Sequence, residues 1–273
     1  MKKAKKTRVI PGYHLTFGIV ITLLSLIVLI PLASVLVYAL KLSPGEWFRL
    51  IMKENVRNAF LTSVGCSFLA AVINTVFGLI LAWTLVKYEF PGKKLLDGFI
   101  ELPFALPTAV AGITLSKLFS DSGFYGKIFA KLGIQIAYTK TGLVISLIFV
   151  GRAVQPVLEK MDGQYEEAAF MLGASRRKTF LAVILPELRP ALLTGFGLAF
   201  ARGIGEYGSV IYISGNSAKD KTQVISYVIM QKLGMIDYES ATAIALLMLI
   251  ISFVLLLFIN IVQARQSART NLL

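Results

Sequence analysis

Apolar residues gather into long runs separated by short polar stretches. Because about 20 consecutive apolar residues are enough to cross a hydrocarbon core, such runs predict membrane-spanning helices. The expected spans are 14–40, 58–86, 99–119, 141–158, 191–214 and 241–262. We therefore expect an all-α integral membrane protein with six transmembrane helices in a single transmembrane domain, residues 14–262.

The first apolar run follows a basic tail, residues 1–13, as the hydrophobic region of a signal peptide would. Its apolar part, 15–40, exceeds the about 7–15 residues of such a region, so it is interpreted as a retained membrane helix. Basic residues favour the cytoplasmic side of a membrane. The tail carries the densest cluster of them, which places this tail and the C-terminal tail, 263–273, in the cytoplasm after six crossings.

Composition excludes several other classes of protein. The net charge is +13, but the basic residues lie in short segments between apolar runs, so no nucleic-acid partner is expected. The lone Cys66 and lone His14 lie on separate predicted helices, which leaves no disulfide, no metal cluster and no nucleophile with its base. No phosphate-binding loop of the G-x-x-x-x-G-K-[ST] type occurs, so any ATP is hydrolysed by a partner.

One polar segment, residues 160–189, is too charged to insert into a membrane. It has high helix propensity over 164–172, then Gly173 as a helix stop, then a basic cluster at 176–178. This pattern predicts a short helix parallel to the membrane at its cytoplasmic face. Such a helix could lie on anionic lipid, but with few large apolar residues it would gain little from a bilayer, which favours docking to a protein groove.

The polar segment resembles the cytoplasmic EAA loop of ABC importer permeases, with Val183 in place of the usual isoleucine. The resemblance implies the type I ABC importer permease fold and a short helix that docks on a cytoplasmic ATPase subunit. The matching positions, which the resemblance implies form the coupling loop, are Glu167, Ala168, Ala169, Gly173, Leu185 and Pro186.

Two further stretches, 102–112 and 205–216, look like the sulfate/thiosulfate branch of these permeases, and molybdate permeases share related forms. The resemblance implies import of sulfate, or of molybdate or another oxyanion, by alternating access. It also implies three kinds of protein partner: ABC ATPase subunits that carry ATP and Mg, a second permease subunit in a homo- or heterodimer, and an extracytoplasmic anion-binding protein. No cofactor is expected in this chain.

The chain departs from that family at one place. Where other members carry several more apolar residues, this sequence passes from Val150 through Gly151 to Arg152. A loss of about six residues would shorten the fourth helix by about 9 Å, just before the polar segment.

Charged residues inside the fifth predicted span are the remaining candidates for function. Arg202 and Glu206 are four residues apart, so on a continuous helix they share a face and can pair. Because charge is costly at membrane depth, they mark either a translocation pathway, with Ser209 as a further donor, or a structural interhelix pair. Membrane carboxylates also serve ion coupling, which keeps an ion-coupled secondary transporter as the alternative class.

The same span contains G-x-G-x-x-G at 203–208, but within an apolar helix, so dinucleotide binding is rejected. The small residues Ala199 and Gly203 instead predict the close approach of another helix. Asn74 in the second span is expected to donate an interhelix hydrogen bond.

Overall fold

The computed structural model describes residues 13–148, 154–161 and 163–270. Within these ranges every regular element is helical. Four continuous helical stretches there are long and apolar enough to cross a membrane: Leu15–Ala39, Glu54–Lys87, Arg176–Gly205 and Tyr238–Ala264. The helices predicted at 14–40, 58–86 and 241–262 are confirmed.

Two of these stretches contain a proline without breaking. The first comprises α1 (Tyr13–Leu24), the π-helical turn η1 (Ser25–Leu29) and α2 (Ile30–Ala39), and the third comprises α11 (Arg176–Thr179), the π-helical turn η2 (Phe180–Ile184) and α12 (Leu185–Gly205). After each turn one backbone N–H bonds to the carbonyl five residues back, and Pro31 or Pro186 follows directly. Because proline lacks an N–H and crowds the preceding turn, the wider π turn lets the helix continue.

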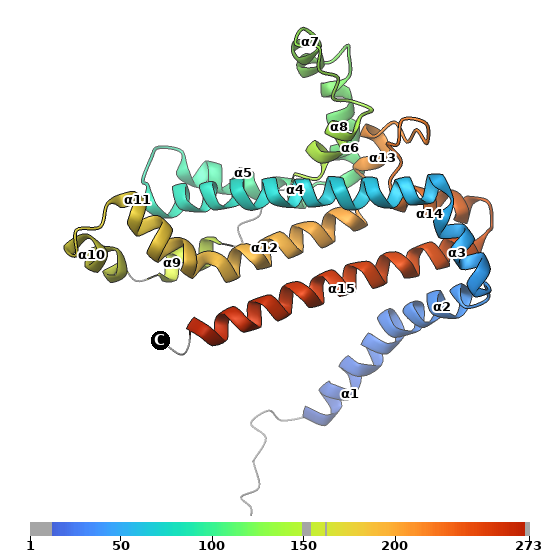
Figure 1. The fold of residues 1–273 in the computed structure, drawn as a ribbon, viewed down its shortest axis with the longest axis horizontal. Coiled ribbons are helices and arrows are strands. Elements are labelled where there is room, and N and C mark those ends of the chain that lie inside the picture. Colours follow the sequence, from blue (N-terminus) through green and yellow to red (C-terminus); the bar gives the residue numbers. More distant parts are fainter. Residues whose placement is uncertain (1–12, 149–153, 162, 271–273) are drawn as a thin grey trace, which may run out of the picture.

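The long helices form a layer (Figure 1). Helix α12 packs between α4 (Glu54–Lys87) and α15 (Tyr238–Thr270), and α2 packs on α15. A Cβ added at Gly203 of α12 would lie 3.0 Å from the Ser67 Oγ of α4, which confirms the close approach predicted for this helix. Asn74 of α4 donates from Nδ2 to the carbonyl of Leu147, 3.1 Å away, so the predicted interhelix hydrogen bond is also confirmed.

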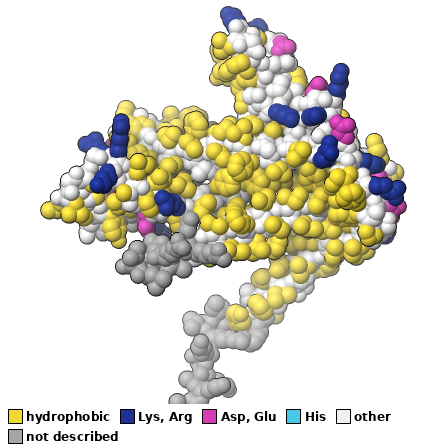
Figure 2. Space-filling view, viewed as in Figure 1, with side chains coloured by type: hydrophobic (Ala, Val, Ile, Leu, Met, Phe, Trp, Pro, Cys, Tyr) yellow, Lys and Arg dark blue, Asp and Glu magenta, His cyan; other side chains and the backbone are white. Residues whose placement is uncertain are grey.

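Hydrophobic side chains cover the long helices, whereas charged residues gather at the ends of the layer and on its projections (Figure 2). In the first stretch, Leu15–Ala39, none of the most apolar window is buried inside the protein. This distribution suits a lipid environment, in which exposed apolar side chains are stable and charges are not.

The third predicted span, 99–119, is two helices rather than one. Helix α5 (Lys93–Ala105) ends before Leu106 and Pro107, and α6 (Thr108–Phe119) begins after them. Leu106 is extended, with a ψ of 138°, because the residue before a proline is disfavoured in helical geometry. Pro107 has a non-helical ψ of 129°. At 1.5 Å per residue neither helix spans a hydrocarbon core of about 30 Å.

The fourth and fifth predicted spans also differ from expectation. Helix α8 (Lys140–Ser146) ends before residues 147 and 148, and α9 (Gln155–Lys160) follows, so 141–158 is not one helix. The shortening predicted at 150–152 lies outside the described residues. The helix predicted at 191–214 starts earlier and stops at Gly205, and α13 (Val210–Ile213) comes after a non-helical stretch, 206–209.

Helices α6, α8 and α13 pack together, and with α7 (Phe124–Ala130) they form an arm, residues 108–146 and 210–213, that projects from the layer (Figure 1). At one end of the layer, α3 (Pro44–Met52) and α14 (Ile225–Gly234) contact α4. The polar segment, with α10 (Gln164–Met171), lies at the opposite end.

Candidate functional site

The polar segment folds as a short helical hairpin at the end of α4. Helix α10 ends at Met171, and Gly173, the residue after its C-cap Leu172, has a φ of +76°. The N–H of Ala174 donates to the carbonyl of Ala169 at 3.0 Å, and that of Gly173 to Phe170 at 2.9 Å. These two bonds define a Schellman motif, in which glycine tolerates the left-handed conformation. The predicted helix stop is confirmed.

The residues implied to dock an ATPase differ in exposure. Glu167, Ala168 and Gly173 are exposed, whereas Ala169 is buried against the rest of the chain. Ala169 therefore supports the helix from beneath, while the other three are accessible to another protein.

Large apolar side chains also project from α10, and sequence reasoning missed them. Met171 and Leu172 are each 89% exposed, and Tyr165 and Phe170 are exposed as well. Our expectation of few large apolar residues on this helix was wrong. The sequence feature that could have predicted these exposed side chains is the run Phe170-Met171-Leu172 directly before Gly173. Three adjacent residues of a helix point in different directions, so they cannot all face one buried surface.

Contacts with α4 hold the hairpin in place. Lys87 at the end of α4 forms an ion pair with Glu166 in the first turn of α10. The Trp83 ring of α4 meets the Phe180 ring edge-on, with centroids 5.2 Å apart. Both partners on the hairpin side belong to the polar segment, so the hairpin contacts the second membrane helix at two points.

Leu185 and Pro186, which the resemblance assigns to the coupling loop, lie inside a continuous helical stretch. Leu185 is the first residue of α12, directly after the π turn, and both side chains are partly buried. The fifth membrane helix therefore begins within the polar segment at Arg176, and α10 is linked to it by only four residues, 172–175.

Arg202 and Glu206 do not share a continuous helix. Arg202 is partly buried in the last turn of α12, and Glu206 is the residue after its end, with an extended ψ of 131°. The carboxylate of Glu206 accepts from the backbone N–H of Ser209 at 3.1 Å, and its carbonyl accepts from Ser226 at 2.8 Å. The expectation that Arg202 and Glu206 lie on one face of a continuous helix was therefore wrong.

Ser209 lies in the contact between the non-helical stretch 206–209 and the start of α6. A Cβ at Gly112 would lie 2.3 Å from the Ser209 carbonyl oxygen, and one at Gly208 would lie 2.2 Å from the Thr108 Oγ1. The Ser209 side chain is fully buried, and within the described part of the chain its Oγ has no hydrogen-bond partner. Both glycines are thus needed for the two segments to meet.

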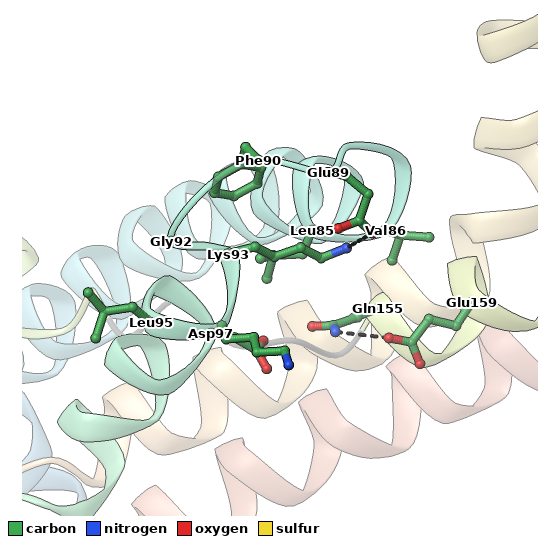
Figure 3. A pocket seen from close by; sticks show the side chains of 11 residues that line it. Leu85, Val86, Glu89, Phe90, Gly92, Lys93, Leu95, Asp97, Gln155 and Glu159 are labelled. Carbon is green, nitrogen blue, oxygen red and sulfur yellow. Dashed lines mark hydrogen bonds and ion pairs between the residues drawn. The ribbon is translucent and has the colours of Figure 1, made fainter.

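A cavity of ≈ 880 Å³ adjoins the hairpin, between the end of α4, α5 and α9 (Figure 3). Glu89 and Lys93 pair across its rim at 2.6 Å, and Gln155 donates to Glu159 at 2.9 Å. The lining mixes both signs of charge, so it does not select an anion. Among the described residues, no group of three or more His, Cys, Asp or Glu side chains could hold a metal ion.

Comparison with known proteins identifies the family. Residues 74–272 match the family described as "Binding-protein-dependent transport system inner membrane component". The sulfate transport system permease protein CysT of Escherichia coli K12 is 45% identical over 267 residues, 96% of each chain. CysT of Synechococcus elongatus is 42% identical, over 91% of this chain and 90% of its own.

Solved structures agree at the level of the fold. A bacterial ABC transporter involved in the import of the acidic polysaccharide alginate contains a chain that matches 93% of this chain and 96% of its own, with a TM-score of 0.77 and 16% identity. The alginate transporter in complex with its alginate pentasaccharide-bound periplasmic protein matches with a TM-score of 0.76. The chain therefore belongs to the binding-protein-dependent transport system inner membrane components and is a multi-pass inner-membrane permease subunit of an ABC importer, a transport component rather than an ATPase.

Proposed function

We propose that this chain is the permease subunit of an ATP-driven sulfate importer and that α10 is its ATPase-coupling helix. The observation that carries the proposal is the exposed face of α10, held on α4 by the Lys87–Glu166 ion pair. The sulfate assignment is supported by the motifs at 102–112 and 205–216 and by relatives named as sulfate permeases.

Docking would use both polar and apolar contacts. Glu167 offers a carboxylate for charge-assisted hydrogen bonds, and Ala168 and Gly173 let a partner backbone approach. Met171 and Leu172 would fill the partner's groove, and burial of each is worth about 1.5–3 kcal/mol. This apolar tip gives the helix far more binding energy than a single ion pair would.

Transport would proceed by alternating access. Two ATPase subunits, carrying ATP and Mg, would close on each other, draw the two α10 helices of a permease dimer together and turn the path outward. Because α10 is tied to α4 and lies only four residues from the helix that continues into α12, its movement reaches two membrane helices. Either a second copy of this chain or a related permease would complete the path.

We propose six crossings with both tails, 1–13 and 263–273, in the cytoplasm and one permease domain, 14–262. The four long helical stretches would supply four crossings, and α5 with α6 and α8 with α9 would supply two interrupted ones. In support, α15 ends towards the side of the layer where α10 lies (Figure 1). An extracytoplasmic anion-binding protein would deliver sulfate to the opposite side, at loops 120–140 and 215–240.

Within the membrane, Arg202, Glu206 and Ser209 stay candidates for the path or for structural support of it. Glu206 and Ser209 are buried in this conformation, so a role in the path would require the contact between 206–209 and α6 to open. The segments pack closely at Gly112 and Gly208, so this contact could be formed in one conformation of the permease and broken in another.

The test of the coupling role is co-purification in mild detergent of the tagged chain with the ATPase subunits of its host. We expect the wild type and Glu239→Lys, a matched charge reversal at an exposed position of α15 outside the polar segment, to retain the ATPase. Glu167→Lys should lose it. Retention by Glu167→Lys would contradict the assignment, and vesicle binding by the isolated permease that depends on Met171 and Leu172 would favour the lipid-bound alternative.

The test of the substrate is uptake of labelled sulfate by the reconstituted complex, with molybdate as competitor. Uptake of sulfate that an equal concentration of molybdate does not suppress supports the assignment. Preferential uptake of molybdate would instead make this chain a permease for that oxyanion.

A further inference from the structure

A second cavity, of ≈ 430 Å³, lies on the arm and is lined by hydroxyl groups. The end of α6, the turn after it, the residue before the α8 cap and α13 all contribute to it. Its polar lining consists of Ser116, Lys117, Ser120, Ser122, Tyr138 and Tyr212. These are five hydroxyl groups and one ammonium group, and no carboxylate appears among the described residues that line it.

We propose that this cavity is a transfer site for a tetrahedral oxyanion, the substrate class of the proposed function on which this inference rests. Every polar side chain in the lining has a donor group, which is the chemistry that an acceptor-only dianion requires. Ser116 donates to Tyr138 and Ser120 donates to the carbonyl of Lys117, so these two hydroxyl groups would rotate to donate to the anion. A water occupies about 30 Å³ of liquid, so the cavity accommodates an oxyanion together with several waters. The anion therefore need not lose its whole hydration shell to enter.

The cavity is formed by local geometry that is costly to maintain. Tyr138 has a φ of +65°, which is rare for a bulky residue, and its N–H donates to the carbonyl of Ile213 at 2.7 Å. Gly215 packs closely against Tyr138: a Cβ added at position 215 would lie 3.0 Å from the Tyr138 Cβ. This conformation brings the Tyr138 hydroxyl to 3.4 Å from the Ser116 Oγ of α6, which donates to it.

The turn after α6 is equally constrained. A Cβ at Gly123 would lie 2.3 Å from the carbonyl oxygen of Lys117, so only glycine allows the chain to fold back there. As a result Ser120 and Ser122 lie at the same rim, with their Oγ atoms 3.3 Å apart. Hydroxyl groups from segments up to 96 positions apart in the sequence, at 116 and 212, thus line one cavity.

The balance of charge suits passage rather than tight binding. Lys117 supplies one positive charge, but the C-terminal end of α6 carries about half a negative charge at the same place. A transport site must attract the ion and also release it, which a single lysine with neutral donors achieves better than a cluster of cations. Exposed polar groups on the arm are also too costly to face lipid, so this face should border the aqueous path.

The experiment uses the complete complex in nanodiscs, with Cys66, the sole native cysteine, replaced by alanine and Ser116→Cys as reporter. The probe is an anionic sulfonatoethyl methanethiosulfonate reagent, and the measurement is its labelling rate with and without sulfate at constant ionic strength. We expect sulfate to slow labelling about fivefold and sodium chloride to have no such effect. Lys117→Gln should abolish the protection, whereas Lys127→Gln, on α7 and outside the lining, should keep it.

Uptake is measured in parallel on chains without the reporter. Lys117→Gln should lower sulfate uptake about tenfold, equivalent to about 1.4 kcal/mol. Tyr212→Phe should lower it severalfold, with the ATPase still bound in both variants. If the wild-type complex transports sulfate but sulfate does not protect the reporter, or chloride protects equally, the transfer site is wrong and the proposed function stands. If the wild-type complex does not transport sulfate, the proposed function itself is wrong.

Discussion

Lys87, the last residue of α4, forms an ion pair with Glu166 in the first turn of α10, and the two side chains are 30% and 21% exposed. The pair joins the second membrane helix to the helix that we propose binds the ATPase. Among the described residues, it is an ion pair that joins α10 to the membrane layer.

Loss of this ion pair should uncouple transport from ATP hydrolysis. Lys87→Glu places two carboxylates together, and because such pairs are worth up to about 1 kcal/mol we expect up to about fivefold less sulfate transported per ATP. The double variant Lys87→Glu with Glu166→Lys should recover most of the loss. A double variant no better than the single one would mean that the contact has no coupling role.

Gly173→Ala should weaken ATPase binding. An L-residue at a φ of +76° costs about 1–2 kcal/mol, so the end of α10 would unfold or shift and the affinity should fall about fivefold or more. Gly163→Ala is the matched control, because Gly163 has a φ of −61° and open space around it. Equal affinities of the two variants, measured by titration of the ATPase, would contradict the role of the Schellman turn.

Gly112→Ala should destabilise the permease itself. The added Cβ meets backbone atoms of residue 209, which cannot rotate away, so the cost should be about 1–3 kcal/mol. Gly65→Ala in α4 meets nothing within 4 Å and should leave the melting temperature in detergent unchanged or slightly raised. A melting temperature for Gly112→Ala equal to that of Gly65→Ala would show that the contact between α6 and 206–209 can relax.

Asp237 should make stability depend on pH at the turn between α14 and α15. Burial raises the pKa of its carboxyl, but hydrogen bonds from Lys232 at 2.9 Å and from the N–H of Ser240 at 3.1 Å outweigh that effect, so the pKa lies below its ordinary value of 3.8. A lowered folded-state pKa means that the carboxylate stabilises the fold above 3.8 and loses this contribution as the pH falls through the folded value.

The comparison for this prediction is Asp237→Asn, which keeps an N-cap side chain but removes the charge. At neutral pH the wild type should be more stable by about 0.2–1 kcal/mol. The difference between the two melting curves should close as the pH is lowered through the folded-state pKa. A difference that is the same at all pH values would exclude the ionised carboxylate as its source.

Elements that depend on neighbours in the sequence were predicted well. The length of apolar runs predicted the first, second and sixth membrane helices, because the cost of exposing backbone and polar groups to lipid is set by the segment itself. Gly173 as a helix stop and the close approach at Gly203 follow equally from local conformation and side-chain size.

Elements whose structure depends on residues distant in the sequence were predicted poorly. The apolar run at 99–119 contains a break at Leu106 and Pro107, and the run at 191–214 stops at Gly205. The stretch 206–209 packs against α6 through Ser209 and Gly112, so it is covered by protein, whereas Leu106 and Pro107 are exposed. A hydropathy profile cannot distinguish an apolar segment that is covered by protein from one that faces lipid.

The sequence by itself determined that this is a helical membrane permease, because apolar run length carries that information, and a short local motif predicted a docking loop. Only the tertiary structure decided which side chains meet: Lys87 with Glu166, the exposed tip of α10, and the hydroxyl-lined cavity on the arm. Contacts between residues tens of positions apart depend on helix breaks, helix packing and glycine clearances that act together, and no single segment encodes them.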